Sequence, residues 1–334
     1  MRCFWDERQR AHAPAAEFFD GALHPAAEHP GRVDAILAAI GRTETPENRG
    51  EAPLLRVHPL GYCEFLRTAH AQWRAAGRDG DAFPYTFPVV HRRPLNLSRI
   101  DALLGQYSYD TSTPIGEGSW TASYWGAQTA LAGLEAVLAG ERAAFALCRP
   151  PGHHAGADYM GGYSYLNNAA IAAEASLAAG SRRVAILDVD YHHGNGTQDI
   201  FYARGDVFFA SIHADPATDY PFYWGHADEA GEGEGEGATL NLPLPRGTRL
   251  AAYEAALGTA LERIAAFGAD LLIVSYGADT YAGDPISHFA IETADYPVLA
   301  RRIAALGLPT LVVMEGGYAV DALGANVAGF LSGF

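Results

Sequence analysis

The sequence has little cysteine and no long hydrophobic run. Its three cysteines, Cys3, Cys63 and Cys148, form no Cys-x-x-Cys pair and leave one residue over, which excludes a disulfide framework. No stretch reaches the roughly 18 consecutive apolar residues of a membrane-spanning helix. The first residues contain no apolar core of signal-peptide length. We therefore expect a cytoplasmic protein that has no membrane partner.

Positive charge is also scarce. The chain has 23 Lys and Arg residues against 39 Asp and Glu residues, which gives a net charge of −16 at pH 7. Nucleic-acid binding depends on neutralising phosphates, so this balance argues against a nucleic-acid partner. The same charge would attract a cationic ligand, although solubility alone explains it equally well.

Apolar strand-like runs alternate with helical segments from residue 119 onward. The expected strands are 143–148, 184–188, 207–212, 271–276 and 310–314. The expected helices are about 119–139, one that ends near 180, 198–204, 249–267, 295–306 and a terminal helix. This alternation predicts an α/β fold with an open, mainly parallel sheet and helices on both faces. A chain of 334 residues fits a single domain of this kind.

The remaining segments are less regular. Residues 32–40 have a helical pattern, and Leu54-Leu-Arg-Val-His58 is a short strand candidate. Residues 77–118 contain four prolines and no lasting period, which predicts a long excursion, because structureless loops of that length are uncommon unless they carry a function. The alternating Gly and Glu residues of 231–237 predict a mobile acidic surface loop; a lid over the substrate is a secondary interpretation.

Polar side chains follow four of the predicted strands. After the run that begins at Val184, Asp188, Asp190 and His192 alternate, so their side chains should share one side of the strand. Burying two carboxylates there costs several kcal/mol unless a cation pairs with them. Similar groups occur in Arg149-Pro-Pro-Gly-His-His, Gly277-Ala-Asp-Thr and Glu315-Gly-Gly-Tyr. Ligands bind beyond the carboxyl ends of parallel strands, so we expect the four loops to meet. For one loop taken alone, the alternative is that its polar residues only cap the helix that follows and bind no metal.

The metal-ligating groups in these loops predict a hydrolase. Asp190, His192 and Asp279 would supply three ligands and leave coordination positions open, as in a catalytic zinc site. Water bound to such an ion becomes a usable nucleophile near neutral pH.

The remaining polar groups suit proton transfer and oxyanion binding. His153 and His154 would take and return protons, with Asp188 and Asn195 as partners that hold their tautomers. Tyr318, which follows two glycines, would donate a hydrogen bond to a developing oxyanion. Together with the metal, these groups predict hydrolysis of an amide or ester.

The four motifs together resemble those of the zinc-dependent histone deacetylase superfamily. They stand at 149–154, 188–197, 277–280 and 315–318. Within the superfamily, the chain is most similar to bacterial acetylpolyamine amidohydrolases, with which it shares the stretches 161–168, 198–202 and 312–318. The resemblance covers nearly the whole chain and implies a single-domain arginase–deacetylase fold over residues 1–334.

The resemblance also implies roles for individual residues. It repeats the zinc ligand set given above, makes His154 the general base and acid, and places His153 beside it, held by Asp188. Tyr318 would polarise the carbonyl of the substrate. Asn195 stands where some members have an aspartate, which implies a weaker dyad with His154.

Further residues would bind substrate or structural ions. The residues expected to contact substrate are Asp110, Tyr165, Tyr220 and Gly316. The family also has structural K⁺ sites. One would be formed by Asp188, Ser211 and the main-chain oxygens of Asp190, His192 and Ile212. The other would lie near Phe201, Arg204 and Val207.

The expected protein is a Zn²⁺-dependent deacetylase of small cationic acetylated amines, such as acetylputrescine or acetylcadaverine. It would form a homodimer through the excursion at 77–118. A protein lysine deacetylase or a longer-chain deacylase is one alternative, and a non-catalytic small-molecule sensor is another. A ureohydrolase with two manganese ions is disfavoured because a second Asp-rich ligand set is missing. The preferred acyl group, the physiological amine and the choice between zinc and ferrous iron stay open.

Overall fold

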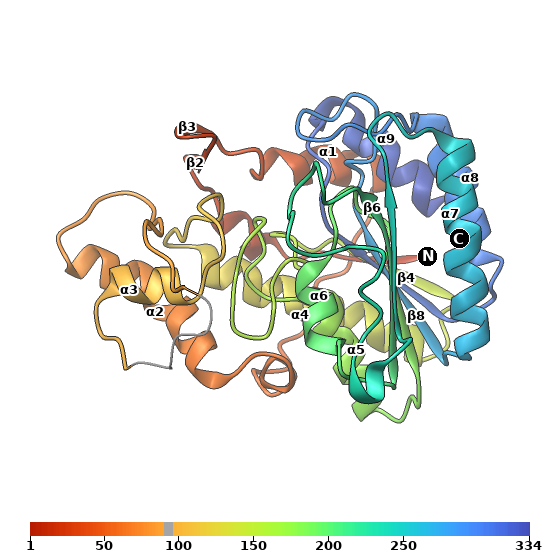
Figure 1. Ribbon diagram of the computed structural model, residues 1–334, viewed down its shortest axis with the longest axis horizontal. Helices are drawn as coiled ribbons and strands as arrows, with labels where there is room; N and C mark the ends of the chain where they lie inside the picture. The colour runs from red at the N-terminus through yellow and green to blue at the C-terminus, as the bar shows by residue number, and fades with distance from the viewer. Residues whose placement is uncertain (90–95) are drawn as a thin grey trace.

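A seven-stranded sheet runs through the middle of the molecule (Figure 1), and all its neighbouring strands are parallel. The computed structural model describes residues 1–89 and 96–334. In spatial order the strands are β1 (Arg2–Phe4), β4 (Ala143–Ala146), β9 (Thr310–Met314), β8 (Leu271–Tyr276), β5 (Val184–Asp188), β6 (Val207–Ala214) and β7 (Thr239–Leu244). The five strands predicted from the sequence form the centre of this sheet.

The two edge strands were not predicted. β1 is too short to show a period of two, and Pro243 in β7 weakens the strand signal, because proline cannot donate to a sheet ladder. An edge position tolerates this proline.

Helices cover both faces of the sheet, as predicted (Figure 1). One face is covered by α4 (Ser119–Leu138), α5 (Asn168–Ala178) and α6 (Asn195–Phe201). The other is covered by α1 (Gly31–Ile40), α7 (Leu250–Phe267), α8 (Tyr296–Ala304) and α9 (Val320–Leu331). Alternate strand residues point into two separate cores: in β8, Leu271 and Ile273 pack on the α4 side, and Leu272 and Val274 on the other. Because both faces of the sheet are buried, the strands are continuous apolar runs in the sequence, which is the pattern that predicted them.

The amino-terminal part of the chain also forms a small sheet that is separate from the main one. A hairpin of β2 (Ala16–Phe19) and β3 (Ala22–Pro25) projects from the body (Figure 1). Its two-residue turn is Asp20-Gly21, with φ values of +49° and +75°, a combination that favours Gly and Asp. Short 3₁₀ turns occur at η1 (Glu7–Ala11), η2 (Leu54–Arg56), η3 (Gly233–Gly235) and η4 (Thr293–Asp295).

The short strand expected at 54–58 is wrong. These residues form η2 and the turn that leads into α2 (Leu60–Ala75). Leu54, Val57 and His58 are the buried positions, and their spacing of three and four residues is helical rather than alternating.

The excursion at 77–118 is partly helical. It contains α3 (Ile100–Gln106), which packs against α2, and an antiparallel bridge between Ala82 and Ile115. Tyr85 and Val89 are 71% and 65% exposed, whereas the adjacent Val90 lies outside the described residues. Among the described helices, none is long and apolar enough to cross a membrane.

Candidate active site at the carboxyl edge of the sheet

Four neighbouring strands bring the predicted polar loops together. β4, β9, β8 and β5 are adjacent in the sheet, and their loops leave from the same edge because the strands are parallel. Asp188 is the last residue of β5, and Asp190 and His192 lie in the loop beyond it, so the alternation read from the sequence runs past the end of the strand.

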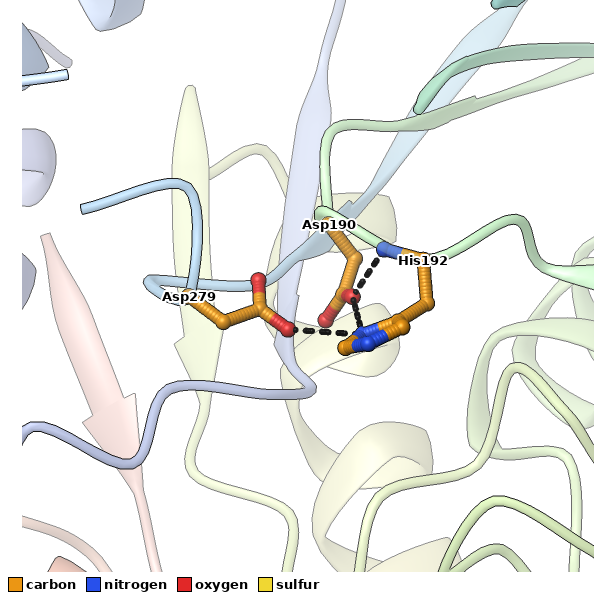
Figure 2. A group of neighbouring side chains, drawn as sticks. All are labelled: Asp190, His192 and Asp279. Atoms are coloured by element: carbon orange, nitrogen blue, oxygen red, sulfur yellow. Dashed lines mark hydrogen bonds and ion pairs between the residues drawn. The ribbon is translucent and has the colours of Figure 1, made fainter. Parts of the chain in front are cut away.

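Asp190, His192 and Asp279 converge at this edge (Figure 2), with one ligand atom of each within 4.8 Å of the others. Nδ1 of His192 lies 3.0 Å from Oδ2 of Asp279 and 3.3 Å from Oδ1 of Asp190. Two carboxylate oxygens and an imidazole nitrogen are a donor set that a catalytic zinc ion accepts.

Two glycines make room for these carboxylates. A Cβ atom at Gly277 would lie 2.0 Å from Oδ2 of Asp190, and one at Gly316 would lie 2.6 Å from the same oxygen. The N–H of Gly316 donates to that oxygen at 2.8 Å. The Asp190 carboxylate therefore packs against backbone at two positions where only glycine fits. This packing holds the carboxylate in a fixed position, as a metal ligand requires.

Burial and mutual repulsion perturb the two carboxylates. Burial, together with the charge of Asp190, raises the pKa of Asp279 to about 7. For Asp190, burial acts in the opposite direction, but the cationic histidines His153 and His192 hold its pKa below the usual range. A bound divalent cation would relieve the repulsion from Asp190 that helps to raise the pKa of Asp279.

The histidine pair has two different partners. Nδ1 of His153 lies 3.0 Å from Oδ2 of Asp188, and Nδ1 of His154 lies 2.7 Å from Oδ1 of Asn195. Burial alone would lower the pKa of His153, but the charges of Asp188 and Asp190 raise it to about 10. Burial and the neighbouring His153 hold the pKa of His154 well below its usual value. At neutral pH, His153 is therefore charged and His154 is a neutral base.

Glu315 supports the histidine loop, although the sequence suggested no role for it beyond its motif. It is fully buried, and its Oε2 accepts the N–H groups of Gly152 at 2.6 Å and His153 at 3.2 Å. Its Oε1 accepts the Ser275 hydroxyl at 3.1 Å. The carboxylate thus ties β8 and β9 to the loop after β4.

The Tyr318 loop is held from two sides. Oδ2 of Asp284 accepts the N–H groups of Tyr318 at 2.7 Å and Ala319 at 3.2 Å. The Arg32 guanidinium donates to the carbonyl oxygens of Gly317 at 2.7 Å and Glu315 at 2.6 Å, and it lies 4.7 Å from the Tyr318 ring. Neither Asp284 nor Arg32 stands in a motif recognised in the sequence.

A buried acid holds Arg32 in turn. Glu28 accepts from Arg32 at 3.0 Å and from Arg149 at 2.9 Å, and all three side chains are nearly inaccessible to solvent. Removing one partner of a buried ion pair typically costs about 3–5 kcal/mol. The cluster joins the segment before α1 to the loops after β4 and β9, a long-range contact that no local pattern signals.

A pocket of about 430 Å³ opens above these groups. The little-exposed His154, His192 and Tyr318 form its floor, whereas the exposed Phe19 and Asp20 of the β2–β3 hairpin form part of the mouth. The other lining residues are Ser112, Gly162, Tyr163, Tyr220, Pro285, Ile286 and His288. Its size falls within the range of small-molecule sites.

The prediction that Tyr165 lines the channel is corrected by the structure. Tyr165 is 1% exposed in the core beneath α4, and its hydroxyl donates to the carbonyl of Pro114. Tyr163 lines the pocket instead and packs edge-to-face on Tyr318. Its left-handed backbone, with φ of +63°, is uncommon for a non-glycine residue. The resemblance from which Tyr165 was assigned does not show which of the two tyrosines such a turn brings to the pocket.

Of the other predicted substrate residues, one lines the pocket and two lie behind or beside its lining. Tyr220 lines it, and Gly316 lies against the metal-ligand candidates. Asp110 lies directly behind the lining, with its Oδ2 accepting from Gly162 at 2.7 Å and Tyr220 at 2.8 Å. No residue of the acidic segment 231–237, for which a lid was the secondary interpretation, is among those that line the pocket.

The predicted potassium-site residues are also neighbours. Asp188 and Ser211 are paired in the β5–β6 register, and Ile212 follows Ser211 in β6. In the second set, the N–H of Arg204 donates to the carbonyl of Phe201 at 2.9 Å.

Known proteins match this chain along its whole length. The histone deacetylase domain matches residues 24–334. Acetylpolyamine amidohydrolase 1 of Pseudomonas aeruginosa is 51% identical, over 100% of this chain and 99% of that protein. The acetylpolyamine amidohydrolase of Mycoplana ramosa is 47% identical, over 100% and 99% of the two chains.

Solved structures agree with the sequence comparison. The acetylpolyamine aminohydrolase of Burkholderia pseudomallei superposes with a TM-score of 0.95 at 43% identity, covering 100% of this chain and 98% of that one. The predicted arginase–deacetylase fold is therefore confirmed. Family model, relatives and fold lead to one conclusion: the chain belongs to the histone deacetylase family.

Proposed function

We propose that this protein is a Zn²⁺-dependent deacetylase that hydrolyses the acetyl amide of small cationic amines, with acetylated diamines and polyamines as its substrate class. The observation that carries the proposal is the convergence of Asp190, His192 and Asp279 beside His154 and Tyr318 at the floor of one pocket. Membership of the histone deacetylase family makes the protein a deacetylase, and relatives named acetylpolyamine amidohydrolases support the substrate class.

Asp190, His192 and Asp279 would hold the ion, which supplies Lewis-acid activation of the amide carbonyl and of water. His154, neutral because burial and the charge of His153 lower its pKa, takes the proton from the attacking water. It then returns that proton to the leaving amine nitrogen. His153, kept charged by Asp188, stabilises negative charge nearby.

Tyr318 supplies the oxyanion donor. Burial raises the pKa of its hydroxyl well above the usual value, so the group keeps its proton at neutral pH and donates it as a hydrogen bond. The contacts of Asp284 and Arg32 with its loop hold the ring at the pocket floor, where the carbonyl oxygen acquires charge.

The mouth suits a cation. Asp20 lines it, and Asp110 lies behind the lining beside Tyr220, where a distal ammonium of the substrate would pair with it. The net charge of −16 would also steer a polycation toward the protein. Acetyl-lysine has the same aliphatic arm, so a protein lysine deacetylase is the competing function.

Structural potassium ions belong to the same proposal. Asp188, Ser211 and the main-chain oxygens of Asp190, His192 and Ile212 would bind one ion, and the backbone near Phe201, Arg204 and Val207 would bind another. Support for the first site is the pairing of Asp188 with Ser211 in adjacent strands.

We also propose that residues 77–118, as part of a single domain of residues 1–334, form a homodimer interface that narrows the pocket mouth. Tyr85, Phe87 and Val89 are exposed in this segment. Clustered exposed apolar side chains of this kind usually contact a partner.

The metal assignment predicts that Asp279→Ala loses one divalent ion per chain. The substitution removes one of three protein ligands, so affinity should fall enough for the ion to be lost on gel filtration. Elemental analysis of the purified protein measures it. Asp321→Ala, on the exposed side of α9, is the control and should keep full metal content. Equal metal content in both variants would show that the ligand set is wrong.

The Tyr318 assignment predicts that Tyr318→Phe lowers kcat by about 10²–10³ with little change in KM, because the hydrogen bond forms mainly in the transition state. Steady-state kinetics on an acetylated diamine measures both constants. A tyrosine that only packs on the pocket wall would change KM alone, and that result would remove the oxyanion role.

The substrate assignment predicts a higher kcat/KM for N-acetylputrescine and N-acetylcadaverine than for an acetyl-lysine peptide. The advantage should shrink at high salt, because ions screen the attraction between the acidic protein and the amine. Kinetics at low and high ionic strength tests both points. A peptide preferred by about tenfold or more would identify a protein deacetylase. A preference for the acetylated amines that does not change with salt would mean that shape rather than charge selects the amine.

The assembly assignment predicts a particle of twice the 35.6 kDa chain mass in light scattering at micromolar concentration. Tyr85→Asp should shift the protein toward monomer, because a charge buried in an apolar interface is costly. Leu138→Asp, an exposed apolar position at the end of α4, is the matched control and should leave the mass unchanged. A monomeric wild-type protein contradicts the proposal.

A further inference from the structure

Asn195 has two neighbours on the same oxygen. Its Oδ1 accepts from Nδ1 of His154 at 2.7 Å and from the Tyr109 hydroxyl at 3.3 Å. Asn195 is fully buried, and among the described residues its Nδ2 has no hydrogen-bond partner. The described hydrogen bonds that set the orientation of the amide are therefore those of Oδ1.

The orientation of this amide determines where His154 carries its proton. With Oδ1 toward Nδ1, the proton stays on Nδ1 and Nε2 is free to accept a proton from water. A reversed amide would donate an N–H group to Nδ1, and the histidine proton would then lie on Nε2. A carboxylate at this position would have no such ambiguity, because both its oxygens only accept.

A chain of hydroxyl groups leads from Asn195 to the pocket mouth. The Tyr109 hydroxyl contacts the Tyr220 hydroxyl, and the Tyr220 hydroxyl also lies 2.8 Å from Oδ2 of Asp110. The sequence of contacts is thus Asp110, Tyr220, Tyr109, Asn195 and His154. It joins Asp110, behind the pocket lining, to the proposed base at the floor.

The two tyrosine hydroxyls have fewer protons than the contacts they make. Each hydroxyl has one proton, but the contacts between Asp110 and Asn195 number three. If Tyr220 donates to Asp110, Tyr109 donates to Tyr220, and Asn195 must then present its N–H end. If Tyr220 donates to Tyr109 instead, Tyr109 donates to Asn195 and holds Oδ1 toward His154.

A cation at the mouth favours the second arrangement. Oδ2 of Asp110 already accepts from the N–H of Gly162 at 2.7 Å and from the Ser112 hydroxyl at 3.0 Å, so Tyr220 is a third donor to one oxygen. An ammonium group paired with Asp110 would compete with these donors, and of the three only the Tyr220 hydroxyl has a second described acceptor, the Tyr109 oxygen. The Tyr220 proton would then turn toward Tyr109.

We propose that Tyr109 and Tyr220 are positioning residues that couple a cation bound at Asp110 to the tautomer of His154 through Asn195. This inference rests on the proposed function, because it requires that Asp110 contact a cationic substrate. Its consequence is that the ammonium group of the substrate raises the rate of the chemical step in addition to strengthening binding.

The test compares N-acetylputrescine with N-pentylacetamide, in which a methyl group replaces the ammonium. In the wild-type protein, kcat should be higher for the cationic amide. In Tyr109→Phe and Tyr220→Phe, kcat for N-acetylputrescine should fall by about tenfold or more, within the range that general base catalysis contributes. The kcat ratio of the two substrates should approach one. For Tyr109→Phe the KM ratio should persist, because Asp110 is unchanged.

Two further variants separate positioning from structural damage. Tyr124→Phe removes a hydroxyl that donates to another asparagine, Asn48, at 2.6 Å on the exposed side of α4, and it should behave as wild type. Tyr109→Phe combined with Asn195→Asp should recover kcat for both substrates, because a carboxylate accepts from Nδ1 in either orientation. A merely structural role for Tyr109 would not be rescued in this way.

The outcomes are distinct. An unchanged kcat ratio in both phenylalanine variants overturns the coupling, as does a change confined to KM or a double variant that stays slow. If the zinc-loaded wild-type protein hydrolyses neither amide, the proposed function itself fails.

Discussion

Buried negative charge at the carboxyl edge of the sheet is the constraint on which the site depends. Asp190 and Asp279 are both inaccessible to solvent, and their ligand atoms lie within 4.8 Å of each other and of His192. Unpaired, these charges would cost several kcal/mol. The surrounding backbone is shaped to them, because Gly277 and Gly316 leave no space for a side chain beside Asp190. A divalent cation would satisfy the donor set, and the same ion would supply the proposed chemistry.

A second set of buried charges holds the loops in place. Glu315 binds the backbone of the histidine loop, and Asp284 binds the backbone of the Tyr318 loop. Glu28 pairs with Arg32 and Arg149, which places an ion cluster between the amino-terminal segment and the active-site edge. These groups touch backbone rather than substrate. Their effect is to give His154 and Tyr318 fixed positions before substrate arrives, which is the condition for electrostatic catalysis.

Floor and mouth of the pocket come from different parts of the chain. The floor is built by loops of the central strands, whereas the mouth includes the tip of the β2–β3 hairpin, which the first third of the chain provides. The proposed coupling uses the hydrogen-bonded contacts that run from Asp110 through Tyr220 and Tyr109 to Asn195.

The sequence alone was sufficient to predict the parallel α/β architecture, the family and the residues that converge at the sheet edge. Buried parallel strands are continuous apolar runs, and the polar residues that end them, such as Asp190 and Asp279, stand out against that background. Tertiary structure decided the rest. Helical spacing of Leu54, Val57 and His58 replaced an expected strand, a left-handed turn put Tyr163 rather than Tyr165 in the pocket, and long-range contacts brought Glu28 to Arg149. Local patterns report which face of an element is buried, but not which distant side chain meets it there.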